Sequence, residues 1–209
     1  MSASSTGVAQ PLPLTVVLRQ GATPVRQGGS NDGLWLVRSG ALRVAQVSND
    51  GHELVLDVAG QGHLVGEPPG VVSPVTVRAL RPSRLVSVPP RAAADLLAAR
   101  AHRAAALAAD LAWLDVRTRV ARRLEDLADR FGRPVEGGRL IQLPLTQDEM
   151  AALAGAARES INRALRALME EGTVRMAARG RYVVRTKLTV VESDKFSGFR
   201  AHVGADGYR

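Results

Sequence analysis

The chain of 209 residues contains no cysteine, which excludes disulfides, thiolate zinc sites, cysteine-ligated iron–sulfur clusters and cysteine nucleophiles. Aromatic residues are scarce, at 3% of the composition. No apolar run approaches the roughly 18 residues that a membrane-spanning helix needs. The opening MSASSTGVAQPLPL also lacks the basic start and apolar core of a secretory signal. We therefore expect a cytoplasmic protein that does not associate with membranes, with residues 1–13 disordered.

The histidines do not indicate a metal or haem site. Only four are present, and neither a haem-ligand pattern nor the His-x-His pair of a cupin-like enzyme occurs among them: His52, His63, His102 and His202. We predict no metal ion, no catalytic residue and no enzymatic activity. A barrel with cupin-like catalysis is the competing enzymatic hypothesis.

Positive charge is concentrated in the C-terminal half. The net charge is +8 and the isoelectric point about 11.2. Residues 116–187 hold 15 Lys and Arg against 9 Asp and Glu. Such a distribution favours a polyanionic partner, nucleic acid above all. Charge that serves only solubility is the simpler alternative.

The pattern of turns and short alternating segments predicts an all-β unit over residues 1–90. Gly, Pro, Asn and Asp separate the segments LWLVRSGALRVAQVS, HELVLDVAG, VTVRAL and RLVSVP, which is typical of a compact antiparallel barrel or sandwich. Asn49-Asp50-Gly51 is a hairpin turn signal, because glycine tolerates the positive φ of tight turns.

An Ala- and Leu-rich stretch follows Pro89-Pro90 and predicts a long helix over residues 91–114. A 4,3,4,3 spacing within it is that of a coiled-coil seam and indicates dimerisation through Leu97, Ala101, Ala104, Ala108 and Leu111. Packing of the same helix on its own barrel would use the same residues. Asp115 is expected to end it and to cap a helix over residues 116–130.

Residues 115–187 are predicted to form a winged helix-turn-helix, which makes the chain α+β. Thr146 and Glu149 fit a capping box, and Gly155 stands where a left-handed residue ends a helix. LIQLPL resembles a strand, ARESINRALRALMEEG a second helix, and a hairpin turns at residues 178–180. Residues 188–209 form a tail without a predicted role.

Polar side chains gather at the start of that second helix. A helix-turn-helix presents this end to the major groove, where Arg bridges guanine O6 and N7 and Glu accepts from cytosine N4. Arg158, Glu159 and Arg163 are therefore the candidates for reading bases. The alternatives are a solvated charged face and a winged helix that contacts protein.

Residues from about 19 to 185 resemble the cyclic AMP receptor protein/FNR (Crp/Fnr) family of bacterial transcription regulators. The similarity is carried by GQGHLVGE, LAWLDVRTRVARRL and LTQDEMAALAGAARESINRALRALMEEG. It implies a cyclic-nucleotide-binding-like double-stranded β-helix and a homodimer that contacts double-stranded DNA at a TGTGA-like inverted repeat, activates transcription and contacts RNA polymerase. It assigns base reading to Arg158, Glu159 and Arg163, and backbone contacts to Thr146, Ser160, Arg179 and Arg181. Ala157 departs from the family's usual Ser.

The effector pocket implied by the resemblance is incomplete. Gly66 and Glu67 are kept, but Ser73-Pro74 replaces the family's phosphate-binding Arg-Ser pair, and Ala104 and Ala105 replace hydroxyl residues on the long helix. Gly66, Glu67 and Arg78 are thus candidates for a vestigial pocket. Arg78 is expected to pair with Glu67 or another carboxylate; substitution for the missing phosphate-binding Arg is the alternative. We predict no cofactor and no dependence on cyclic AMP; gating by cyclic AMP or another small ligand is the alternative.

Overall fold

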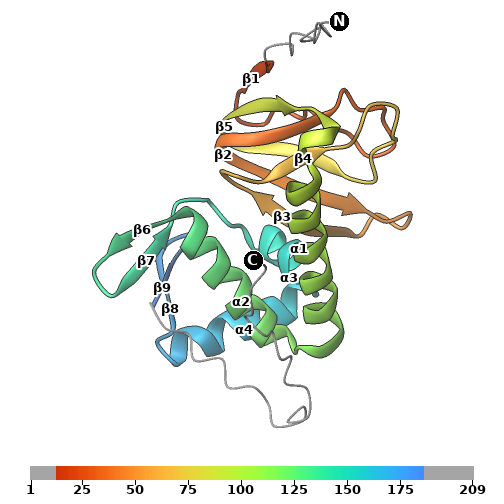
Figure 1. Cartoon of the computed structure of the whole chain (residues 1–209). Helices are drawn as coiled ribbons and strands as arrows, with labels where there is room; N and C mark the ends of the chain where they lie inside the picture. The colour runs from red at the N-terminus through yellow and green to blue at the C-terminus, as the bar shows by residue number, and fades with distance from the viewer. Residues whose placement is uncertain (1–12, 186–209) are drawn as a thin grey trace, which may run out of the picture.

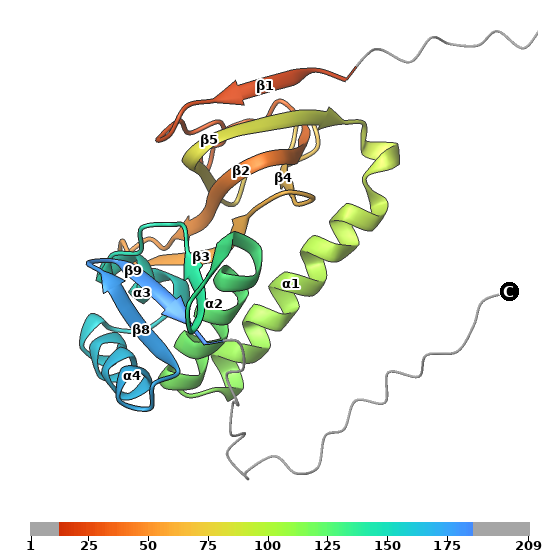
Figure 2. The same ribbon diagram turned by 90° about the vertical axis from the view of Figure 1, so that its left-hand side faces the viewer.

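The computed structural model describes residues 13–185, so the expectations for residues 1–12 and 188–209 lie outside the described part. A β-barrel forms one end and a helical head the other, with the long helix α1 running between them (Figures 1 and 2). The α+β class and the order of barrel, long helix and winged helix-turn-helix are confirmed. Within residues 13–185, no helix is long and apolar enough to cross a membrane.

The barrel is antiparallel, as predicted. Its sheet has the order β1-β5-β2-β3, with β4 also pairing with β2. The strands are β1 (Thr15–Leu18), β2 (Leu34–Val47), β3 (Glu53–Ala59), β4 (Leu64–Gly66) and β5 (Thr76–Val88). Gly51 turns the β2–β3 hairpin with φ of 86°. Alternate side chains fill the interior, including Val37, Leu42, Val77, Ala79 and Leu85.

Strand β5 joins two segments that the sequence suggested were separate. Pro82 lies where the pairing of β5 with β2 is irregular, between the pairs Ser39–Arg84 and Ala41–Arg81. A residue without an N–H is tolerated at such a bulge, so the strand continues through the proline.

Two helices follow the barrel, and a sharp break separates them. Helix α1 (Ala94–Trp113) comes after a 3₁₀ turn (Pro90–Ala92), and α2 (Val116–Phe131) after Leu114 and Asp115. The Asp115 carboxylate accepts a hydrogen bond from the Thr118 N–H at 2.7 Å. The predicted cap is confirmed, and α2 ends one residue later than expected.

The head combines helices α3 (Gln147–Ala154) and α4 (Arg158–Glu170) with a four-stranded sheet of order β6-β7-β9-β8. Its strands are β6 (Gly132–Val135), β7 (Gly138–Ile141), β8 (Val174–Ala178) and β9 (Arg181–Val184). Strand β6 was not predicted, and the strand expected over residues 140–145 ends at Ile141. Leu143 and Leu145 are buried in alternation, as in a strand, but Pro144 between them cannot donate to a ladder.

The head is packed on the barrel rather than tethered to it. One apolar core extends from the barrel strands into the head, and its barrel members are Ala41, Ala45, Val55 and Val58. Helix α3 lies against β3, so the helix-turn-helix packs directly on the barrel.

Candidate nucleic-acid interface

The turn between α3 and α4 is fixed at both ends of α3. The Thr146 N–H donates to Glu149 Oε2 at 2.6 Å, and the Glu149 N–H donates to Thr146 Oγ1 at 3.1 Å, which is the predicted capping box. Gly155 ends α3 in the left-handed region, with φ 59° and ψ 49°. A Cβ there would also lie 2.7 Å from Leu111 Cδ2 of α1. The positive φ favours glycine, and any larger residue would also force the Leu111 side chain to move.

Helix α4 buries one side and exposes its leading end. Its buried residues are Ile161, Ala164, Leu165 and Leu168. Arg158, Glu159 and Arg163 are all exposed. Ala157 provides no side-chain cap. Backbone N–H groups of the first turn therefore lack a capping acceptor, face outward and can bind an anion.

The guanidinium groups of α4 have weak partners within the chain. Arg158 Nε donates to Gln147 Oε1 at 3.0 Å, and its Nη1 lies 3.6 Å from Asp148 Oδ1. Arg163 Nη2 donates to Ser160 Oγ at 3.3 Å. Exposed pairs of this kind contribute about 0–1 kcal/mol, so either arginine can exchange its partner for a base at small cost.

The wing turn lies beside the start of α3. The Leu145 N–H donates to Gly180 O at 2.8 Å, which brings the turn carrying Arg179 and Arg181 next to Thr146. Both arginines are exposed, and no ion pair links them to another residue in the described chain. The hydroxyl oxygen of Thr146 accepts in the capping box, so its O–H remains free to donate to a phosphate oxygen.

Comparison with known proteins identifies the family that has this arrangement. Residues 15–100 match the cyclic nucleotide-binding domain, and residues 118–188 match the Crp-like helix-turn-helix domain. The CRP-like cAMP-activated global transcriptional regulator of Mycobacterium tuberculosis is 30% identical over 177 residues, which cover 77% of this chain and 79% of the relative. The chain belongs to the Crp/Fnr family of transcription regulators.

Other Crp/Fnr proteins are also similar to this chain in sequence and in structure. The cyclic AMP receptor protein of Thermus thermophilus is 35% identical over 175 residues, 75% of this chain and 77% of that protein. The solved structure of a CRP/FNR-family transcriptional regulator from the same organism has a TM-score of 0.73 at 26% identity, covering 82% of this chain and 93% of the other. This Crp/Fnr chain is therefore a DNA-binding transcription regulator.

Arg119 of α2 is a positioning residue that sequence reasoning missed. Its Nη1 donates to Leu111 O at 3.3 Å and Leu114 O at 3.2 Å, and its Nη2 donates to Gly155 O at 3.3 Å. One guanidinium thus connects the end of α1 to the turn before α4. An arginine placed one turn after a helix break was the available signal.

Arg100 of α1, also missed, lies against the residues expected to form the effector pocket. Its Nη2 is 3.0 and 2.8 Å from the two carboxylate oxygens of Glu67, and its Nη1 donates to Gly66 O at 2.7 Å. Glu67 is only 7% exposed, so the Arg100 Nη2 group, which contacts both carboxylate oxygens, satisfies a buried charge. The available signal for Arg100 was its position three residues after Leu97, which places a positive charge on the barrel-facing side of α1.

Of the two partners expected for Arg78, Glu67 is wrong, because Glu67 pairs with Arg100, whereas another carboxylate, Glu53, is affected by its charge. Val77 and Ala79 point into the barrel, and strand alternation turns Arg78 to the exposed face, opposite Arg43. There the hydrogen bond from Arg43 lowers the pKa of Glu53, and the charges of Arg43 and Arg78 add to this effect. The structure therefore separates Arg78 from Gly66 and Glu67.

The predicted dimer seam on α1 is divided between two environments. Leu97 packs with the barrel residues Leu34 and Leu64, and Leu111 is half-buried beside Gly155. The three alanines of the seam are exposed: Ala101, Ala104 and Ala108. The two leucines serve packing within the chain, while the alanines present a surface to the outside.

Proposed function

We propose that this protein is a homodimeric regulator that reads a TGTGA-like inverted repeat with the leading end of α4. The supporting observation is that two guanidinium groups and a carboxylate are exposed on the first turns of a helix whose other side is buried. Arg158 and Arg163 would bridge guanine O6 and N7, and Glu159 would accept from cytosine N4.

Contacts to the DNA backbone would fix the head on the duplex. Thr146 and Ser160 offer hydroxyl donors near the two ends of the turn, and Arg179 and Arg181 offer charge from the wing. Such contacts supply affinity but carry no sequence information. Their number sets the steepness of the salt dependence.

Pairing of two chains would use the exposed face of α1. Ala101, Ala104 and Ala108 allow two helices to approach closely, and Trp113 at the end of α1 is 68% exposed. A symmetric pair would present two heads to successive major grooves about 34–36 Å apart, which matches an inverted repeat.

The same chain is proposed to act without cyclic AMP. Glu67 already has Arg100 as its partner, and the Ser73 hydroxyl donates to Val75 O at 2.8 Å. Ala104 and Ala105 offer no hydroxyl. The second candidate is an effector-gated regulator, favoured by the cAMP-activated relative at 30% identity. Calorimetry separates the two: micromolar cyclic AMP binding would support the gated regulator.

At its sites on chromosomal DNA in the cytoplasm, the dimer would contact RNA polymerase and act as an activator. This part of the proposal rests on the family alone. Transcription in vitro from a promoter that carries the selected site would test it, with and without the protein.

Selection of binding sites from random duplexes, without added ligand, tests the motif, its symmetry and the need for an effector together. Arg158→Ala should weaken binding by about 1–3 kcal/mol and relax specificity at one base pair. Arg166→Ala is the matched control, because Arg166 is exposed two turns further along α4. Equal affinity of the Arg158 variant and the wild type would favour a winged helix that contacts protein.

A further inference from the structure

A second contact between barrel and head lies at the end of α2. Phe131, the last residue of α2, is 4% exposed. A Cβ on Gly60, directly after β3, would lie 2.9 Å from the Phe131 ring atoms Cε1 and Cζ. The ring therefore rests on the barrel backbone. The guanidinium carbons of Arg81 and Arg130 lie 5.5 and 5.4 Å from the ring centroid, within cation–π range.

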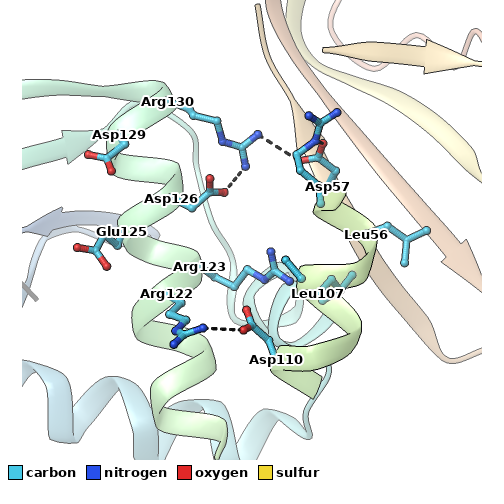
Figure 3. Close-up of a pocket in the computed structure, with 12 residues that line it drawn as sticks. Leu56, Asp57, Leu107, Asp110, Arg122, Arg123, Glu125, Asp126, Asp129 and Arg130 are labelled. Atoms are coloured by element: carbon cyan, nitrogen blue, oxygen red, sulfur yellow. Dashed lines mark hydrogen bonds and ion pairs between the residues drawn. The ribbon is translucent and has the colours of Figure 1, made fainter. Parts of the chain in front are cut away.

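One carboxylate of β3 connects the elements that meet beside this ring. Asp57 Oδ1 is 3.1 Å from Arg130 Nη1 of α2, and Oδ2 is 3.2 Å from Arg103 Nε of α1. His63 Nδ1, from the turn before β4, lies 3.0 Å from Oδ2. Arg130 Nη1 also donates to Val58 O at 2.6 Å, and Arg130 Nη2 donates to Asp126 Oδ2. Figure 3 shows Arg130 between Asp126 and Asp57.

Asp57 is held in its charged form. Burial alone would raise its pKa, but the hydrogen bond to His63 and the charges of Arg130, His63 and Arg103 hold the pKa at about 2, below the ordinary 3.8. The carboxylate therefore stays ionised throughout the physiological pH range.

Different contacts resist rotation of the head relative to the barrel on the two sides of their junction. On the side of α3, apolar side chains form a continuous core. On the other side, a cleft of about 450 Å³ opens between β3, α1 and α2, crossed by the Asp57 pairs and by Arg122 Nη1–Asp110 Oδ1 at 2.9 Å (Figure 3). A packed core resists separation, but it needs a contact on the open side to fix the angle of the head. Asp57 provides such a contact, since its carboxylate pairs with Arg103 of α1 and with Arg130 of α2.

We propose that Asp57 is a positioning residue that sets the angle between barrel and head, and through it the half-site spacing that the dimer accepts. The inference rests on the proposed function, because spacing is selected only when two heads bind one duplex. Within this proposal, the angle depends on the Asp57 ion pairs and on the point where Phe131, itself part of the apolar core, rests on Gly60.

Two substitutions test the proposal, one by removing a charge and the other by removing space. Asp57→Asn removes the charge and keeps the shape. Gly60→Ala keeps all charges but forces the Phe131 ring away, and φ at Gly60 lies outside the left-handed region, so the backbone accepts alanine. Asp129→Asn is the control for the first, because Asp129 is exposed, lines the same cleft and has no ion pair within the described chain. Gly29→Ala is the control for the second.

The first readout is the affinity for inverted repeats whose half-sites are moved apart in single base-pair steps. Asp57→Asn and Gly60→Ala should reduce the preference for the best spacing by about fivefold or more, the effect of losing about 1 kcal/mol of angular restraint. Affinity for a single half-site and the selected bases should not change. Folded variants that keep the wild-type spacing preference would refute the proposal.

The second readout needs no DNA. The chain has no cysteine, so Ser48→Cys and Arg166→Cys place one spin label on the barrel and one on the head. Electron spin resonance, with labelled chains diluted in unlabelled ones, should show a shifted or broader distance distribution in both variants. Unchanged distributions would refute the inference even if palindromic sites are bound. Failure of the wild type to bind any inverted repeat would instead refute the proposed function.

Discussion

Replacing Asp57 by asparagine should destabilise the protein at neutral pH but not in strong acid. The pKa of Asp57 is about 2 in the folded chain against 3.8 as its ordinary value. Since the folded pKa is the lower one, the stabilisation is fully present above 3.8 and is lost as the pH falls through about 2. The difference corresponds to about 2 kcal/mol at pH 7 and about 1 kcal/mol at pH 3.

The difference in the free energy of unfolding between the wild type and Asp57→Asn can be measured at pH 7, 5 and 3. Urea unfolding is monitored by circular dichroism at fixed chain concentration. Asp129→Asn, which removes an unpaired charge from the same cleft, should leave the free energy of unfolding close to that of the wild type. Equal stability of Asp57→Asn and the wild type at pH 7 would contradict this prediction. An equal difference in stability between the two proteins at pH 7 and at pH 3 would contradict it as well.

Three further substitutions test single contacts. Asp115→Ala should lower the free energy of urea unfolding by about 1 kcal/mol, because it removes the acceptor for the Thr118 N–H. Asp115→Asn should keep most of that free energy. Equal loss in both variants would contradict the role of Asp115 as the cap of α2. Gly155→Ala should cost more than about 1 kcal/mol and lower the melting temperature, because alanine is strained at a positive φ and the Leu111 side chain would have to move. An unchanged melting temperature would show that the turn can relax. Arg179→Ala should weaken all duplexes alike and reduce the slope of log affinity against log salt by about 1, whereas a loss confined to one sequence would make Arg179 a base reader.

Much of the head could be predicted from the sequence, because its signals act over a few residues. The capping box of Thr146 and Glu149, the left-handed Gly155 and the Asp115 cap depend on hydrogen bonds and φ values within one turn. The periodicity of α4 likewise determined which side is buried, and therefore that the leading end of the helix faces outward. Alternation and turn residues likewise indicated β2, β3 and the two halves of β5, but not the short strands β1 and β4 or the continuity of β5 through Pro82.

Only the tertiary structure decided which distant side chains meet. Glu67 and Arg100 are separated by 33 positions, and Asp57 and Arg130 by 73. No local pattern encodes such pairs, because they depend on where a helix crosses a barrel. Strand alternation could have placed Arg78 outside the barrel, but it could not name Arg100 as the partner of Glu67. The sequence thus determined the local conformation of each element, while packing between elements determined the charge network that joins barrel and head.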